Sequence, residues 1–99
     1  MHGTMGGMRP LLRRASRKSP RDRVVTLIGK PGCHLCDAAR EVVAAVCEET
    51  GAAWEEWDIT ADEELHRLYW EQIPVVLVDG EQHDFWRVDA GRLRSALGA

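Results

Sequence analysis

Two cysteines, in the run Cys33-His34-Leu35-Cys36, have the residue type and spacing best suited to chemistry in this 99-residue sequence. They follow an apolar run over residues 24–28 and stand where a helical pattern of apolar residues begins. A Cys-x-x-Cys pair between a strand and a helix start is typical of thiol–disulfide exchange, because the helix start favours a thiolate. The pattern therefore predicts a redox-active pair.

Metal binding is the main alternative for this pair. A structural zinc site needs about four ligands, usually supplied as pairs of Cys or His at close spacing. His66 and His83 are not paired in this way, so the sequence favours redox chemistry and predicts no metal site. A metal or iron–sulfur carrier that joins Cys33 of two chains is the third-ranked alternative.

Length and charge indicate one acidic domain behind a basic tail. Residues 1–22 are rich in Gly, Arg and Ser without apolar periodicity, which predicts a disordered tail before a domain over 23–99. A tail that binds nucleic acid or an acidic partner is the weaker interpretation. Residues 24–99 carry 15 acidic and six basic side chains, a net charge of −9. This charge argues against nucleic acid as the partner of the domain.

Cysteine count and hydropathy indicate the compartment. Three cysteines are an odd number and too few for a secreted disulfide framework. No apolar run approaches the ~20 residues of a membrane span, and no apolar segment of a signal peptide follows the basic residues near the start. We therefore expect a cytoplasmic monomer with no membrane partner.

Apolar periodicity and turn signals predict the element order β-α-β-α-β-β-α. The Asp79-Gly80 pair between apolar runs is a strong hairpin signal, and Thr60 with Glu63 matches a helix capping box. Two βα units and a hairpin require a four-stranded mixed sheet flanked by three helices, an α/β fold with parallel first strands. The expected elements are strands at 24–28 and 54–59, strands on either side of the hairpin turn within 72–88, and helices at 33–49, 60–70 and 90–97, the last capped by Asp89.

Inward-facing residues are expected on each helix. Leu65, Leu68 and Tyr69 are predicted to face the sheet from the second helix, and Leu93 and Leu97 from the last. Cys47 follows Cys36 by close to three helical turns, so a buried small hydrophobe is preferred over a third redox thiol. The four Trp residues are expected mostly in the core or half-exposed on strands. A role for Trp86 in lining a substrate groove is the weaker interpretation.

The cysteine pair, the element order and the run Ile73-Pro74-Val75 before the hairpin together resemble the thioredoxin fold, in its glutaredoxin-like branch. Residues 30–36, Lys-Pro-Gly-Cys-His-Leu-Cys, look like the start of the glutaredoxin motif, and the resemblance covers 24–99. It is closest to the small bacterial glutaredoxin-like proteins. It implies that Pro74 follows a cis peptide bond and that Ile73, Pro74 and Val75 form a substrate-binding edge.

With this resemblance, the chemistry expected is that of a thiol–disulfide oxidoreductase. Cys33, at the helix N-terminus, is the expected nucleophile, and Cys36 the resolving thiol that closes a Cys33–Cys36 disulfide. Lys30 and a protonated His34 would add positive charge beside the thiolate. A solvated His34 that only fills the loop is an equal alternative.

Glutathione-binding glutaredoxins usually carry Gly-Gly followed by acidic residues after the last strand. Residues 87–91 here read Arg-Val-Asp-Ala-Gly, so glutathione and a thioredoxin-reductase-type system are both open as the reductant. We expect protein or small-molecule disulfides as substrates and no bound cofactor. The alternative from another class is a thioredoxin-fold binding or scaffold module whose cysteine pair is redox-idle.

Overall fold

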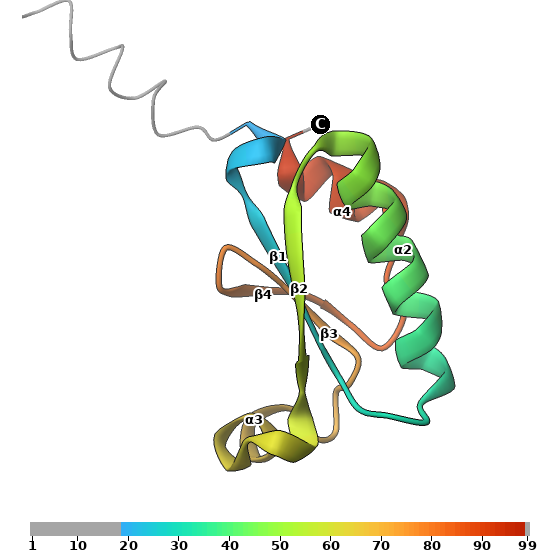
Figure 1. Ribbon diagram of the computed structural model, residues 1–99, viewed down its shortest axis with the longest axis vertical. Helices are drawn as coiled ribbons and strands as arrows, with labels where there is room; N and C mark the ends of the chain where they lie inside the picture. The colour runs from blue at the N-terminus through green and yellow to red at the C-terminus, as the bar shows by residue number, and fades with distance from the viewer. Residues whose placement is uncertain (1–18, 99) are drawn as a thin grey trace, which may run out of the picture.

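The computed structural model describes residues 19–98, in which three α-helices flank a four-stranded sheet (Figure 1). The expected order β-α-β-α-β-β-α is confirmed, with two short 3-10 helices added. No helix within 19–98 is long and apolar enough to span a membrane. The elements are η1 (Pro20–Asp22), β1 (Val24–Gly29), α2 (His34–Thr50), β2 (Ala53–Asp58), η2 (Ile59–Ala61), α3 (Glu63–Tyr69), β3 (Val75–Val78), β4 (Glu81–Phe85) and α4 (Ala90–Leu97).

The sheet is mixed, with the strand order β2-β1-β3-β4. β1 runs parallel to β2 and antiparallel to β3, and β3 runs antiparallel to β4. β1 is buried from its second residue to its last, as expected for an apolar strand covered on both faces. Ile28 lies opposite Val75, and Val75 opposite Phe85. The carboxyl end of β1 therefore meets the amino end of β3.

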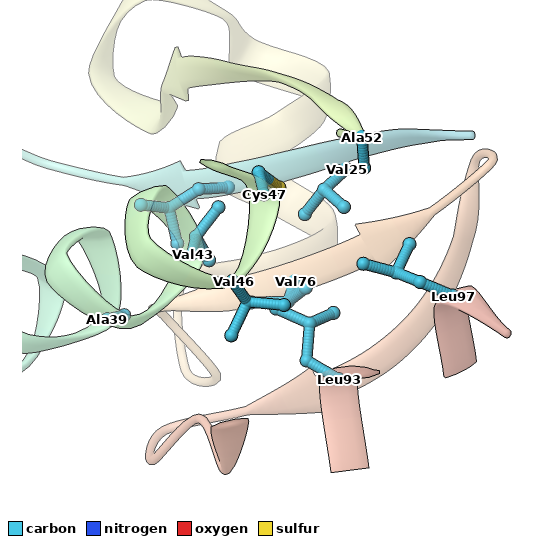
Figure 2. Packing of buried hydrophobic residues seen from close by; sticks show 10 residues of the cluster. Val25, Ala39, Val43, Val46, Cys47, Ala52, Val76, Leu93 and Leu97 are labelled. Carbon is cyan, nitrogen blue, oxygen red and sulfur yellow. The ribbon is translucent and has the colours of Figure 1, made fainter. Parts of the chain in front are cut away.

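The larger core lies between the sheet and the helices α2 and α4 (Figure 2). Val46 of α2, Val76 of β3 and Leu93 of α4 meet there, and Leu93 and Leu97 are fully buried as predicted. The remaining members are Val25, Leu27, Ala39, Val43, Cys47, Ala52 and Leu97. Burial of Cys47 in this cluster confirms that it packs as a small hydrophobe.

A smaller core on the opposite face is covered by α3. It consists of Ile28, Ile59, Val75 and Leu77, with Leu65, Tyr69 and Ile73 packed against it. The prediction that Leu68 faces inward is wrong, because 48% of its surface is exposed. Leu65 and Tyr69, four residues apart, occupy the stripe of this short helix that meets the sheet, and Leu68 falls beside it.

The predicted start of α3 at Thr60 is also wrong. The N-cap is Asp62, whose carboxylate accepts hydrogen bonds from the backbone N–H groups of Glu64 and Leu65. Thr60 lies in η2, where it donates to Asp58. Asp is a stronger N-cap than Thr, which explains why the helix begins after the later candidate.

The hairpin turn is confirmed in detail. Asp79 and Gly80 both have positive φ, 53° and 86°, as a type I′ turn requires. The Asp79 carboxylate also accepts hydrogen bonds from the Val24 backbone N–H at 3.0 Å and from Arg23 at 2.8 Å. The turn is thereby fastened to the start of β1.

Three further boundaries differ from expectation. β3 begins only at Val75, and β4 ends at Phe85, because Trp86 leaves the extended region with a φ of 65°. The predicted tail ended at residue 22, but Pro20–Asp22 forms η1. The rest of the tail prediction, over 1–18, lies outside the described residues.

Candidate active site

Cys33 is the N-cap of α2. Its backbone is extended (φ −101°, ψ 117°), and its sulfur accepts a hydrogen bond from the Cys36 backbone N–H at 3.3 Å. The side chain is partly exposed. A helix start presents unpaired N–H groups and the positive end of the helix dipole. The Cys33 sulfur is therefore accessible and lies at the helix start, where it accepts a backbone hydrogen bond.

Cys36 lies one turn into the helix and is fully buried. Its sulfur rests on Gly29 at the end of β1, where an added Cβ would lie 2.9 Å from the sulfur and 3.2 Å from the Cys36 Cβ. Burial raises the pKa of the Cys36 thiol to about 11, with a smaller contribution from its hydrogen bond with Cys33. Cys36 is therefore a neutral thiol near pH 7.

The structure brings both cysteines together as free thiols, and Cys47 is also free. It thus represents the reduced pair, and the Cys33–Cys36 disulfide stays a prediction. Burial raises the pKa of the Cys47 thiol, in line with its place in the larger core. Within residues 19–98, no three His, Cys, Asp or Glu side chains are grouped to hold a metal ion.

The run Ile73-Pro74-Val75 lies beside the cysteines through the strand register. The Ile73–Pro74 peptide bond is cis, as the resemblance implied. Because Ile28 pairs with Val75, the next antiparallel position sets Pro74 opposite Gly29. Pro74, directly before β3, thus lies beside Gly29, the residue that the Cys36 sulfur contacts.

The three residues of this run differ in how accessible they are. Ile73 is half-buried against the smaller core, and Pro74 is buried. Val75 is fully buried and pairs with Ile28 on one side and Phe85 on the other. The Val75 side chain is therefore not accessible for the predicted substrate contact. It packs beneath the segment that contains Ile73 and Pro74.

Lys30 and His34 are both exposed, Lys30 in the turn before Cys33 and His34 as the first residue of α2. The Lys30 backbone also hydrogen-bonds with Cys36, an interaction that lowers the pKa of that thiol but is outweighed by burial. The predicted roles of both side chains toward the substrate stay predictions.

Arg40 is a residue of the site that the sequence did not single out. Its guanidinium donates to both carboxylate oxygens of Glu56 at 2.8 and 2.6 Å and to Asp37 at 2.8 Å. These hydrogen bonds raise the pKa of Arg40, and those that it donates to Glu56 contribute most. The spacing of three residues between Asp37 and Arg40 could have indicated their ion pair from the sequence, because such residues are neighbours on a helix. The contact with Glu56 depends on how β2 aligns with β1, and this register cannot be predicted from the sequence.

The cysteine pair and the element order agree with a comparison of the sequence with known families: residues 24–98 match the family model of the Glutaredoxin-like domain. The chain belongs to this family. Its fold is accordingly the thioredoxin-like α/β fold, as the sequence predicted.

Relatives of this glutaredoxin-like chain agree in sequence and in structure. An uncharacterized protein of Mycobacterium tuberculosis is 33% identical over 78 residues, which cover 74% of this chain and 80% of that protein. A structural genomics target protein from X. campestris is 35% identical with a TM-score of 0.62, over 75% of this chain and 95% of that one. A mutant thioredoxin from Halobacterium salinarum is 25% identical with a TM-score of 0.58, over 83% and 77% of the two chains.

Proposed function

We propose that this glutaredoxin-like protein is a thiol–disulfide oxidoreductase that works by dithiol exchange. One observation carries the proposal: a partly exposed Cys33 at the α2 N-cap, whose sulfur accepts the Cys36 N–H, in front of a buried Cys36 thiol. One sulfur is accessible to a substrate, and the second is held one helical turn behind it. This is the arrangement that sequential attack and resolution require.

The exchange proceeds in two displacements. The Cys33 thiolate attacks one sulfur of a substrate disulfide, and the other substrate sulfur leaves as a thiolate that takes up a proton. Cys36 then attacks the Cys33 sulfur, and the second substrate sulfur leaves as a thiolate that takes up the proton of Cys36. The substrate gains two electrons, and the cysteine pair loses two as its disulfide forms.

The remaining assignments of the proposal follow from the same site. Lys30 and His34 supply charge beside Cys33, and the backbone of Ile73, next to the cis Pro74, binds the substrate segment as a short added strand. Substrates are protein or small-molecule disulfides, and no bound cofactor takes part. Glutathione or a thioredoxin-reductase-type system returns the pair to the dithiol, in the reducing cytoplasm, with the protein acting as a monomer.

Two single substitutions test this function. Cys33→Ser is expected to abolish reduction of a model disulfide such as insulin, because the accessible nucleophile is lost. Cys36→Ser is expected to accumulate a mixed disulfide on Cys33, because the resolving thiol is lost. Turnover is followed spectroscopically, and the adduct by intact-protein mass spectrometry. Undiminished turnover by Cys33→Ser would refute the proposal.

A redox-idle pair is the second candidate, and the burial of Cys36 is the observation that favours it. A thiol whose pKa is raised to about 11 is seldom ionised near pH 7, so resolution must rely on proximity. Titration of the reduced protein with mild oxidant separates the two. Loss of two thiols with formation of a Cys33–Cys36 bond supports the enzyme, and retention of both thiols supports a binding module.

A further inference from the structure

Trp86 is held in an unusual position beside the site. Its φ of 65° is in the left-handed region, where a bulky residue is strained and glycine is usual. Even so, the residue is fixed: its backbone N–H donates to the Pro74 carbonyl at 2.8 Å, and its indole N–H donates to the Glu71 carbonyl at 3.1 Å. Both partners belong to the segment around the cis peptide bond.

The Trp86 indole forms an exposed apolar surface with its neighbour. The side chains of Trp86 and Phe85 remain 54% and 41% exposed, and their rings meet edge to face with centroids 5.0 Å apart. Exposed aromatic side chains that are rigidly held are the residues that most often dominate binding. We call this pair the aromatic platform.

The strand register places the backbone of Trp86 two strands away from Gly29, the residue that the Cys36 sulfur contacts. Gly29, Pro74 and Trp86 stand in one row across β1, β3 and the end of β4, because Val75 pairs with both Ile28 and Phe85. Two strand spacings separate the ends of that row, roughly 10 Å. An extended segment advances about 3.3 Å per residue. A side chain within a few residues of a substrate half-cystine therefore reaches the platform.

Charge and polarity indicate which disulfides this platform suits. Glutathione disulfide is polar and carries a net negative charge, and this protein is also negative, with a net charge of −9 over residues 24–99 and −3 over the full chain. Like charge disfavours the encounter, and a polar tripeptide gains little from an apolar surface. A protein segment with an apolar side chain next to its half-cystine has neither disadvantage.

We propose that Trp86 is the specificity-determining residue of this site and selects protein disulfides with an apolar side chain beside the half-cystine over glutathione disulfide. The inference rests on the proposed dithiol function and goes further by naming the substrate class. Trp86 binds the neighbouring side chain of the substrate, and Phe85 supports the indole from the side. Neither residue takes part in the exchange of bonds at sulfur.

The test compares three disulfides under single-turnover conditions with the reduced full-length protein. Two are symmetric disulfides of short, uncharged peptides that differ only in whether Phe or Ser follows the cysteine, and the third is glutathione disulfide. The second-order rate constant is expected to be highest with the Phe peptide. Trp86→Ser is expected to lower that rate constant about ten-fold, the loss of one buried apolar contact, and to change the other two less than two-fold.

Two further variants separate specificity from folding. Trp86→Phe retains apolar bulk and is expected to keep most of the preference for the Phe peptide. Trp70→Ser removes an equally exposed Trp (55%) whose ring stacks on His66 of α3, and it should leave all three rate constants unchanged. Equal wild-type rates with the Phe and Ser peptides, or equal losses with all three disulfides in Trp86→Ser, would overturn the inference. No exchange by wild type with any of them would instead refute the proposed function.

Discussion

Gly29 determines how closely Cys36 can approach the sheet. Its φ is not in the left-handed region, so an alanine is compatible with the backbone there. What excludes a Cβ is the Cys36 sulfur, 2.9 Å from where that atom would be. The smallest residue is thus needed for packing of the Cys36 thiol rather than for chain conformation.

We expect Gly29→Ala to destabilise the reduced protein by about 1–3 kcal/mol, the usual cost of overpacking a buried site. In a Cys36→Ala background the sulfur is absent, so the same substitution should cost less than half as much. Urea unfolding of the four proteins measures both costs. Equal costs in the two backgrounds would show that Gly29 serves the backbone and not the thiol.

At the residue scale, the sequence identifies what depends on local spacing. Cys33 and Cys36 are three positions apart, and the Ile73–Pro74 bond stands directly before a recognisable hairpin, so each carries its own signal. Gly29 carries no such signal, and for Trp86 the sequence offered a substrate role only as the weaker interpretation. The importance of Gly29 arises from its contact with the Cys36 sulfur of α2. That of Trp86 arises from the alignment of β1, β3 and β4.

At the element scale, Arg40 fastens the first turns of α2 to β2. The bidentate contact with Glu56 joins helix and strand, and the contact with Asp37 lies within the helix. The strength of such a planar pair exceeds that of a single ion pair. The helix start that carries Cys33 and Cys36 is therefore tied to the edge of the sheet by a side chain outside the cysteine motif.

Arg40→Met, which keeps much of the apolar stem, is expected to cost about 1 kcal/mol of stability. Glu56→Gln should cost a similar amount, and the double variant little more than either, because both remove the same contact. The matched control is Arg67→Met, whose Glu64 partner is far more exposed on α3 and which should cost at most about 0.5 kcal/mol. Additive costs for Arg40 and Glu56 in thermal unfolding would contradict this role.

The order of elements could be predicted because period and turn chemistry are strong local signals. The Asp79-Gly80 turn and the Asp89 N-cap were both confirmed. Failures came where adjacent residues compete for one role. Asp58, Thr60 and Asp62 all have the side chains of helix caps, and the outcome, a 3-10 turn followed by α3, depends on how Ile59 reaches the smaller core.

At the scale of the whole molecule, the stability of the reduced protein should depend on pH through Cys36. Burial raises its thiol pKa from 9.0 to about 11, so the folded state holds the proton more tightly than the unfolded state. The resulting stabilisation is fully present below pH 9 and is lost as the pH rises through 11.

Urea unfolding between pH 8 and 11, with a reductant present, measures this loss for wild type and for Cys36→Ser. Wild type is expected to lose more free energy of unfolding than the variant, by an amount on the order of 2 kcal/mol. The buried Cys47, whose thiol pKa is also raised by burial, contributes equally to both proteins. The expectation fails if the two pH profiles are parallel.

The two cores differ in how far the sequence reveals them. The larger core follows from the long apolar stripe on α2, which periodicity detects, and from the Leu93 and Leu97 pair on α4. The smaller core depends on α3, a seven-residue helix without a fully buried residue. Its pattern is too short to distinguish Leu68 from Leu65 or Tyr69, so the composition of that face had to come from the structure.

The unequal exposure of the two thiols also bears on oxidative damage. Peroxide reaches the partly exposed Cys33 before the buried Cys36, and oxidation there gives a sulfenic acid. Under the proposed dithiol function, Cys36, one helical turn away, is expected to condense with that group, forming a disulfide and releasing water. Cys33 would then not be oxidised further to the sulfinic and sulfonic states, from which ordinary reductants do not recover it. The buried Cys36 thiol would in this way protect the exposed Cys33 from irreversible oxidation.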